Sequence, residues 1–189
     1  VEILQRVLTR WKDEKRHLQR DILLMPTFEP SVYEDLSRDE VEELYFKLVL
    51  EMLGVDSFAL VQVGCLDSWG PCKVFDGLGH MQNLQKKGLV QEIGAIHLDT
   101  KRLKQALDDG IPVKSNLVPY SLIDRRPETT LMPLAAERGV SILLESPLAE
   151  GWLESKYLGA LRPDFLGLAP LPRRAQDAYE VLRKAGGWE

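Results

Sequence analysis

The chain has 189 residues, a length suited to one domain with its own hydrophobic core. Its hydrophobic content of 44% and charged content of 28% are ordinary for a folded protein. The formal net charge of −5 argues against broad electrostatic binding of nucleic acid, which needs clustered Lys and Arg. No apolar run approaches the roughly 20 residues of a membrane span, so no transmembrane segment is expected.

The two cysteines, Cys65 and Cys72, are separated by six residues, unlike the short Cys pairs of zinc ribbons or redox motifs. Gly70 and Pro71 would permit a loop disulfide, but two free thiols in a reducing compartment, the cytoplasm or an organelle interior, are the preferred interpretation. His97 with Cys65, Asp67 and Cys72 matches no common ligand spacing, so we expect no metal site. The chain begins at Val1, without an initiator Met or a signal peptide, which leaves the compartment open.

Apolar segments and turn residues predict a chain that alternates between helix and strand. The first part of the chain predicts a helix over 3–18, a strand over 21–25 stopped by Pro26, a helix opened by a capping box at 37–40 and ended by Gly54, and a strand over 58–63. The middle predicts a helix over 75–87, a strand over 92–96, and a helix capped by Asp99 and ended by Gly110. The last part predicts a strand over 113–118, a helix over 128–138, a strand over 140–144 and a final helix over 173–184.

One of these helices carries a clear apolar stripe at a 3.6-residue period. Its members are Val41, Leu44, Tyr45, Leu48, Val49 and Met52. The spacing predicts that this face packs against the core.

The five predicted strands are apolar throughout and are joined by helices, which indicates a parallel sheet covered on its outer face. No composition shift divides the chain, so residues 1–189 are predicted to form a single α/β domain. Periodicity alone does not separate an open five-stranded sheet from part of a barrel, although no Gly-rich phosphate loop follows the first strand.

Two segments carry a family resemblance. One reads Ser115-Asn116, then Tyr120-Ser-Leu122 and Asp124-Arg-Arg-Pro127; the other reads Ser146-Pro-Leu-Ala149, Gly151 and Lys156-Tyr157. In this order and spacing they resemble the sixth and seventh units of the aldo/keto reductases, NADPH-dependent oxidoreductases built on a (β/α)8 TIM barrel. The resemblance implies a partial barrel of about five parallel strands, the third to the seventh. The first two units and the last fall outside the matched pattern.

The same resemblance shows replacements at positions that carry the family's chemistry. Thr27 stands at the expected Lys that lowers the pKa of the proton donor, and Gly64 at the expected His that orients the carbonyl. Ile96-His97 replaces a Ser-Asn pair, and Leu117 replaces a Gln, both contacts of the nicotinamide amide. No catalytic residue is therefore expected in this chain.

The seventh strand adds two carboxylates, Glu145 and Glu150, where the family has an aromatic or apolar residue and a small residue. A carboxylate beside a diphosphate repels it. The two could also form an acid/base pair, but two solvated carboxylates are the preferred interpretation. If NADP(H) binds, the resemblance assigns its contacts to a short set of residues. They are Asn116, Tyr120, Ser146, Leu148 and Gly151.

Three functions remain open. The first is a family member that has lost catalysis and acts as a structural or interaction subunit of an assembly, with a protein partner covering the open sheet edges. The second is a fragment of an NADPH-dependent oxidoreductase that reduces carbonyl substrates, and the third is a nucleotide- or ligand-sensing module. Large apolar residues in predicted loops, Trp69, Trp152 and Phe165, are candidate contact residues.

Overall fold

The computed structural model describes residues 27–28, 38–64, 74–157 and 173–184. The helices and strands are β1 (Thr27–Phe28), α2 (Arg38–Leu53), β2 (Phe58–Val63), α3 (Val74–Lys86), β3 (Val90–Ile96), α4 (Thr100–Asp108), β4 (Val113–Pro119), α5 (Leu131–Arg138), β5 (Ser141–Glu145) and α6 (Arg173–Lys184), with short 3-10 turns at Arg126–Glu128 and Ser155–Tyr157. The predicted helix over 3–18, the strand over 21–25 and the capping residue Ser37 lie outside the described residues.

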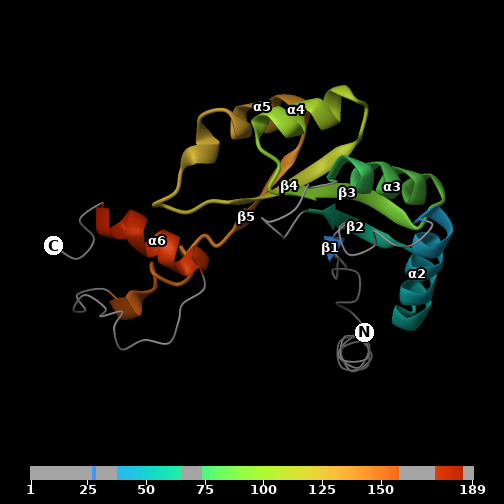
Figure 1. The fold of residues 1–189 in the computed structure, drawn as a ribbon, viewed down its shortest axis with the longest axis horizontal. Helices are drawn as coiled ribbons and strands as arrows, with labels where there is room; N and C mark the ends of the chain where they lie inside the picture. Colours follow the sequence, from blue (N-terminus) through green and yellow to red (C-terminus); the bar gives the residue numbers. More distant parts are fainter. Residues whose placement is uncertain (1–26, 29–37, 65–73, 158–172, 185–189) are drawn as a thin grey trace, which may run out of the picture.

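The five strands form one parallel sheet in the order β1-β2-β3-β4-β5. Each strand therefore lies beside its neighbour in sequence, and the order never reverses. A doubly wound sheet reverses its order at a switch point, whereas the strands of a barrel follow one another around it. The predicted parallel α/β sheet is confirmed, and its order is that of an arc of a barrel (Figure 1).

Several turns form where the sequence predicts them. The Asp99 carboxylate accepts a hydrogen bond of 2.8 Å from the backbone N–H of Arg102 and caps α4. Gly54 and Gly110 follow α2 and α4 with φ of 66° and 79°, the left-handed conformation that glycine adopts at low cost.

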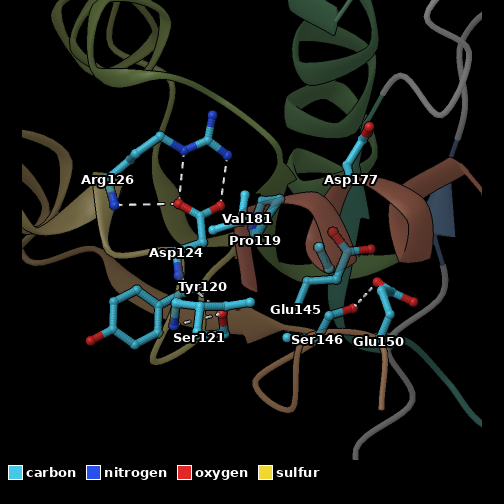
Figure 2. Close-up of a pocket in the computed structure, with 13 residues that line it drawn as sticks. Pro119, Tyr120, Ser121, Asp124, Arg126, Glu145, Ser146, Glu150, Asp177 and Val181 are labelled. Carbon is cyan, nitrogen blue, oxygen red and sulfur yellow. Dashed lines mark hydrogen bonds and ion pairs between the residues drawn. The ribbon is translucent and has the colours of Figure 1, made fainter. Parts of the chain in front are cut away.

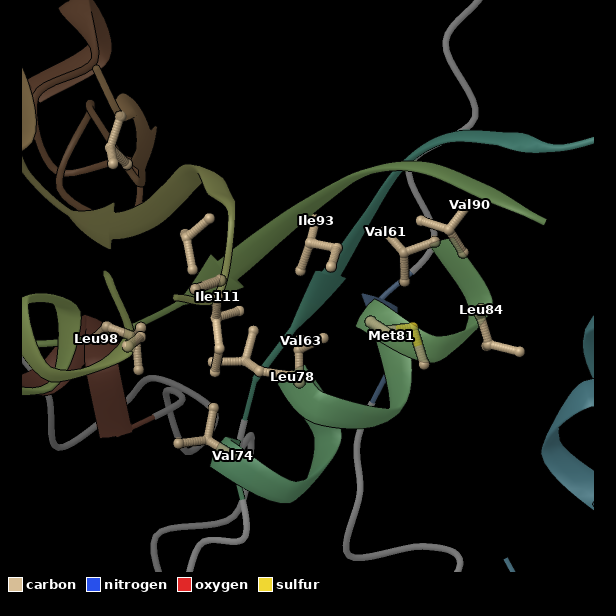
Figure 3. Packing of buried hydrophobic residues seen from close by; sticks show 14 of the residues in the cluster. Val61, Val63, Val74, Leu78, Met81, Leu84, Val90, Ile93, Leu98 and Ile111 are labelled. Carbon is tan, nitrogen blue, oxygen red and sulfur yellow. The ribbon is translucent and has the colours of Figure 1, made fainter. Parts of the chain in front are cut away.

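The main hydrophobic core lies between the sheet and the helices on its outer face. Val61, Val63 and Ile93 point from β2 and β3 toward Leu78 and Met81 of α3, as Figure 3 shows. All five side chains are fully buried. Because residues alternate between the two faces of a strand, Gln62, Gly94 and Ile96 face the other way, toward the interior of the barrel arc.

Of the predicted stripe of α2, Val49 packs against the core, but the other described side chains are exposed. The buried residues of α2 are Phe46, Leu50 and Leu53, and the Phe46 ring meets Phe58 of β2 edge-on with centroids 5.7 Å apart. Among the residues of the predicted stripe, the exposed fractions are 57% for Leu44, 48% for Tyr45, 49% for Leu48 and 41% for Met52. The helix is apolar on both sides, and periodicity does not say which of two apolar faces meets the sheet.

Candidate functional site at the carboxyl ends of the strands

Gly64 and Ile96 occupy neighbouring positions at the carboxyl ends of β2 and β3. A β-carbon added to Gly64 would lie 2.6 Å from Cβ of Ile96 and 3.1 Å from its Cδ1. Real β-carbons do not approach other atoms so closely, so the Ile96 side chain occupies the space that a side chain at position 64 would need. The two replacements are thus coupled: with Ile96 present, position 64 has no room for the imidazole that the resemblance places there.

His97 and Glu145 form a second coupled replacement. The His97 Nε2 atom lies 2.5 Å from Oε2 of Glu145, although the two residues are 48 positions apart. The contact joins the end of β3 to the end of β5, across β4. The side chains are 25% and 23% exposed, so the pair lies at the mouth of the sheet and not in its interior. The interpretation of Glu145 as a merely solvated carboxylate is therefore wrong.

Asn116 faces the helix-covered side of the sheet. Its Oδ1 accepts a bond of 3.2 Å from the Leu98 N–H, and its Nδ2 donates a bond of 2.8 Å to the Leu98 carbonyl oxygen. The side chain is fully buried, and both polar atoms of the amide are used in fixing the loop between β3 and α4. Asn116 therefore has a structural role: it holds the backbone of Leu98.

Tyr120 follows β4 and lies half-buried beside a surface cavity. Its hydroxyl donates a 2.5 Å hydrogen bond to Oε1 of Glu128, a carboxylate that Arg125 also holds. The hydrogen bond to Glu128 is the main reason that the pKa of Tyr120 is raised above its ordinary value, because it favours the protonated phenol. The pair fixes the tyrosine and keeps it neutral.

The segment after β5 is a tight turn with an unusual backbone. Ser146, Ala149 and Glu150 have φ of 54°, 52° and 58°, a region that non-glycine residues rarely adopt, and Gly151 follows with φ of 91°. The Ser146 hydroxyl donates a hydrogen bond to Oε1 of Glu150. Leu148 is 53% exposed.

These segments line a cavity of about 270 Å³ between the ends of β4 and β5 and helix α6 (Figure 2). Of the residues that the resemblance connects with NADP(H), Tyr120 and Ser146 line it, whereas Asn116, Leu148 and Gly151 do not. The described lining residues are Pro119, Tyr120, Ser121, Ile123, Asp124, Arg126, Glu145, Ser146, Ala149, Glu150, Asp177, Ala178 and Val181.

The contribution of α6 to this cavity could not be read from the sequence. A second apolar cluster holds the helix in place: Trp152 packs on Tyr179 and donates a 2.7 Å hydrogen bond to the carbonyl of Ala175. Trp152 is 5% exposed, so its predicted role as an exposed contact residue is wrong. The apolar residues on one face of α6 are a sequence signal that this helix packs against the rest of the protein. They do not indicate which residues the helix packs against.

A polar row crosses the inner face of the sheet below the mouth. Gln62 is opposite Gly94 in the β2–β3 register, and Gly94 is opposite Ser115 in the β3–β4 register. Gln62 and Ser115 are 6% and 4% exposed, yet Nε2 of Gln62 and Oγ of Ser115 have no hydrogen-bond partner among the described residues. Toward the carboxyl ends the next inward-facing residues are Ile96 and Leu117, which are apolar.

Some predicted site residues cannot be placed. Cys65, Asp67, Trp69, Cys72 and Phe165 lie outside the described residues, as does the side chain of Thr27, whose backbone pairs with Gln62. Within the described ranges, no group of three or more His, Cys, Asp and Glu side chains could hold a metal ion. No described helix is long and apolar enough to cross a membrane.

The comparisons with known proteins decide the family. The model of the aldo/keto reductase family matches residues 2–186. The chain belongs to the aldo/keto reductase family. The resemblance of the two segments after β4 and β5 is thereby confirmed, and the chain is a divergent aldo/keto reductase-like protein.

The curated relatives differ widely in kind. The chain is 31% identical to flagellar radial spoke protein 5 of Chlamydomonas reinhardtii over 100 residues, which cover 52% of this chain and 19% of that protein. It is 25% identical to the NADH-specific methylglyoxal reductase of Escherichia coli over 127 residues, 65% of this chain and 37% of that enzyme. In both cases the matched part is well under half of the relative's own length.

Solved structures confirm the fold. The holo form of an aldo-keto reductase from Bacillus halodurans matches with a TM-score of 0.63 at 23% identity, over 96% of this chain and 56% of that one. An aldo-keto reductase from Klebsiella pneumoniae in complex with NADPH matches with a TM-score of 0.61 at 20% identity, over 82% of this chain and 52% of that one. The sheet is therefore part of a TIM barrel.

The family implies NADP(H), but the described residues do not fit it. The inner face at the ends of β2, β3 and β4 presents Ile96 and Leu117, which offer no hydrogen bond to an amide. The mouth presents the carboxylate of Glu150, which repels a diphosphate, beside the His97–Glu145 pair. The residues present therefore make a poor site for the family's cofactor.

Proposed function

We propose that this chain is a family member without NADP(H)-dependent catalysis, which serves as a structural or interaction subunit of an assembly. The observation that carries the proposal is the 2.6 Å approach between Ile96 and a β-carbon at Gly64. Position 64 lacks the carbonyl-orienting side chain that the resemblance implies, and the side chain of Ile96 fills the space that it would need. The His97–Glu145 pair supports the same conclusion, because it uses side chains at the mouth for contact with each other.

The sheet edge and one helix face support a role in contacts. Within the described residues β5 is the last strand in the sheet order, and Leu144 on it is 44% exposed. The exposed stripe of α2, defined by Leu44, Tyr45, Leu48 and Met52, adds a second apolar surface. Unpaired strand edges and apolar patches are surfaces that proteins cover with other protein. One curated relative bears the name of a flagellar radial spoke protein, which agrees with this role.

The test is carbonyl reduction by the longest chain that the source organism makes, at high protein concentration with NADPH and NADH, beside sedimentation of the same sample. We expect no turnover above background, and association with itself or with a partner. Turnover that scales with protein concentration would favour the alternative, a fragment of an NADPH-dependent oxidoreductase. A stable monomer that finds no partner would count against the assembly role.

A further inference from the structure

Three members of the exposed stripe of α2 form a straight apolar row. Leu44, Leu48 and Met52 recur every four residues, so they follow one another along the same side of the helix. Their exposed fractions are 57%, 49% and 41%. The opposite side of α2 is anchored by the Phe46 ring on Phe58 of β2, so the row points away from the sheet. In Figure 1 α2 lies at the margin of the described elements, where a second molecule could reach it.

One flank of this row carries charges of both signs. Lys47 and Glu51 each precede a member of the row by one position, so both lie along the same flank. Lys47 is 57% exposed and lies 2.6 Å from Glu43 of the same helix. Glu51 is exposed and has no ion-pair partner within the described residues. The flank therefore presents a carboxylate that a lysine of another molecule could pair with.

An antiparallel copy of the same helix matches both the row and its flank. Leu44 and Met52 are equally spaced about Leu48. A two-fold axis at Leu48 would therefore place Leu48 against its own copy, and Leu44 against Met52 of the partner subunit. On the flank, Glu51 would lie about 3 Å along the helix axis from Lys47 of the partner subunit, at the rise of 1.5 Å per residue. Opposite charges would thus meet twice, and the two helix dipoles would oppose each other.

We propose that this apolar row is the interface of a two-fold dimer, in which α2 packs antiparallel on α2 of a second copy of this chain. The proposal rests on the role in contacts proposed above, and it names the partner. Leu44, Leu48 and Met52 form the apolar centre of the interface, and the pairs between Lys47 and Glu51 form its polar rim. Because the interface is one helix wide, the dimer is a weak one whose formation depends on concentration.

The test is sedimentation equilibrium of the full natural chain over a range of concentrations, which should show a monomer–dimer equilibrium. Leu48→Glu places two like charges at the two-fold axis and should raise the dissociation constant of the dimer by more than about tenfold. Leu122→Glu, at a leucine that is 78% exposed outside α2, is the control and should leave the constant unchanged. A parent chain that stays monomeric, or equal effects of the two variants, would overturn the proposal.

A charge reversal tests the antiparallel arrangement. Glu51→Lys would place a lysine beside Lys47 of the partner subunit, and it should raise the dissociation constant roughly threefold, the scale of one exposed ion pair. High salt should remove this difference. Glu137→Lys reverses an exposed carboxylate on α5 and should have no effect. Unchanged unfolding temperatures show that the variants fold. If Glu51→Lys associates as tightly as the parent, the antiparallel arrangement is wrong.

The outcomes separate this proposal from the proposed function. A monomeric chain that lacks carbonyl reduction and binds a different protein would overturn the dimer and keep the proposed function. A dimer that reduces carbonyl substrates would keep the interface and overturn the proposed function.

Discussion

The two faces of the sheet differ in what the family resemblance implies for them. On the outer face Val61, Val63 and Ile93 pack on α3 in the ordinary way of a parallel sheet under helices. On the inner face and at the mouth, Gly64, Ile96, His97 and Glu145 stand where the family resemblance implies other residues. The comparison teaches that packing and chemistry occupy opposite faces of the same strands. One can therefore change while the other persists, because successive residues point to opposite sides.

The largest expected effect lies on the outer face. Ile93→Ala removes a fully buried side chain from the middle of β3 and should lower the free energy of unfolding by about 3 kcal/mol, through lost burial and the cavity left behind. The measurement is urea unfolding followed by circular dichroism. Leu144→Ala, at a leucine that is 44% exposed on β5, is the control and should cost less than about 1 kcal/mol. Equal costs would mean that the outer face is not the main core.

The next effect tests the coupling at the mouth. Gly64→His should lower the free energy of unfolding by about 2 kcal/mol, because the new side chain meets Ile96. In the double variant with Ile96→Ser the cost should be smaller than the sum of the two single costs, as expected for residues in contact. Gly79→His on α3 is the control, since a β-carbon there meets nothing within 4 Å. If the costs in free energy of Gly64→His and Ile96→Ser simply add in the double variant, the two positions are not coupled.

A smaller effect of opposite sign is expected from the polar row of the inner face. Ser115→Ala removes a buried hydroxyl that has no hydrogen-bond partner in the described part of the chain, so it should leave stability unchanged or raise it by about 1 kcal/mol. The same urea experiment measures it. A clear loss of stability would show that Oγ of Ser115 has a partner in solution, such as a buried water.

The smallest effect concerns pH and lies far from the mouth. Lys47 and then Lys87 lower the pKa of Glu43 from 4.5 to about 2 by hydrogen bonding to it. A carboxylate with a lowered pKa in the folded protein stabilises it above the unfolded pKa, and this contribution is lost as the pH falls through the folded pKa. Stability should therefore fall between about pH 4.5 and 2, and less steeply in Glu43→Gln. Because both lysines are exposed, the difference should be small and should shrink in salt. Parallel pH profiles for parent and variant would contradict the assignment.

Much of the fold could be predicted because its signals are local. The Asp99 cap, the glycines that end α2 and α4, and the apolar runs of the strands each depend on a few neighbouring residues. The packed face of α2 was for the most part predicted wrongly because both of its faces are apolar. The face that packs contacts Phe58 of β2, a residue that lies outside the helix and so does not enter its periodicity.

The candidate site could be predicted only in part. The replacements at Gly64, Ile96, His97 and Glu145 were visible by comparison with the family pattern, but their pairing was not. It depends on strand register, which brings residues 32 and 48 positions apart into contact. Asp177 was missed altogether, because the apolar face of α6 indicates that the helix packs on something but not that it packs on Trp152. Leu148 and Gly151 were expected to contact NADP(H), which stays a prediction.

The most direct test of the central claim is calorimetric titration of NADPH into the longest natural chain, with NADH in parallel. The account predicts no heat of binding up to millimolar ligand. The mouth of the sheet carries the carboxylates of Glu145, paired with His97, and Glu150, and its inner face offers the nicotinamide amide Ile96 and Leu117 in place of polar groups. Binding with micromolar affinity would contradict it, because a dinucleotide site would then have to form in spite of Glu145 and Glu150.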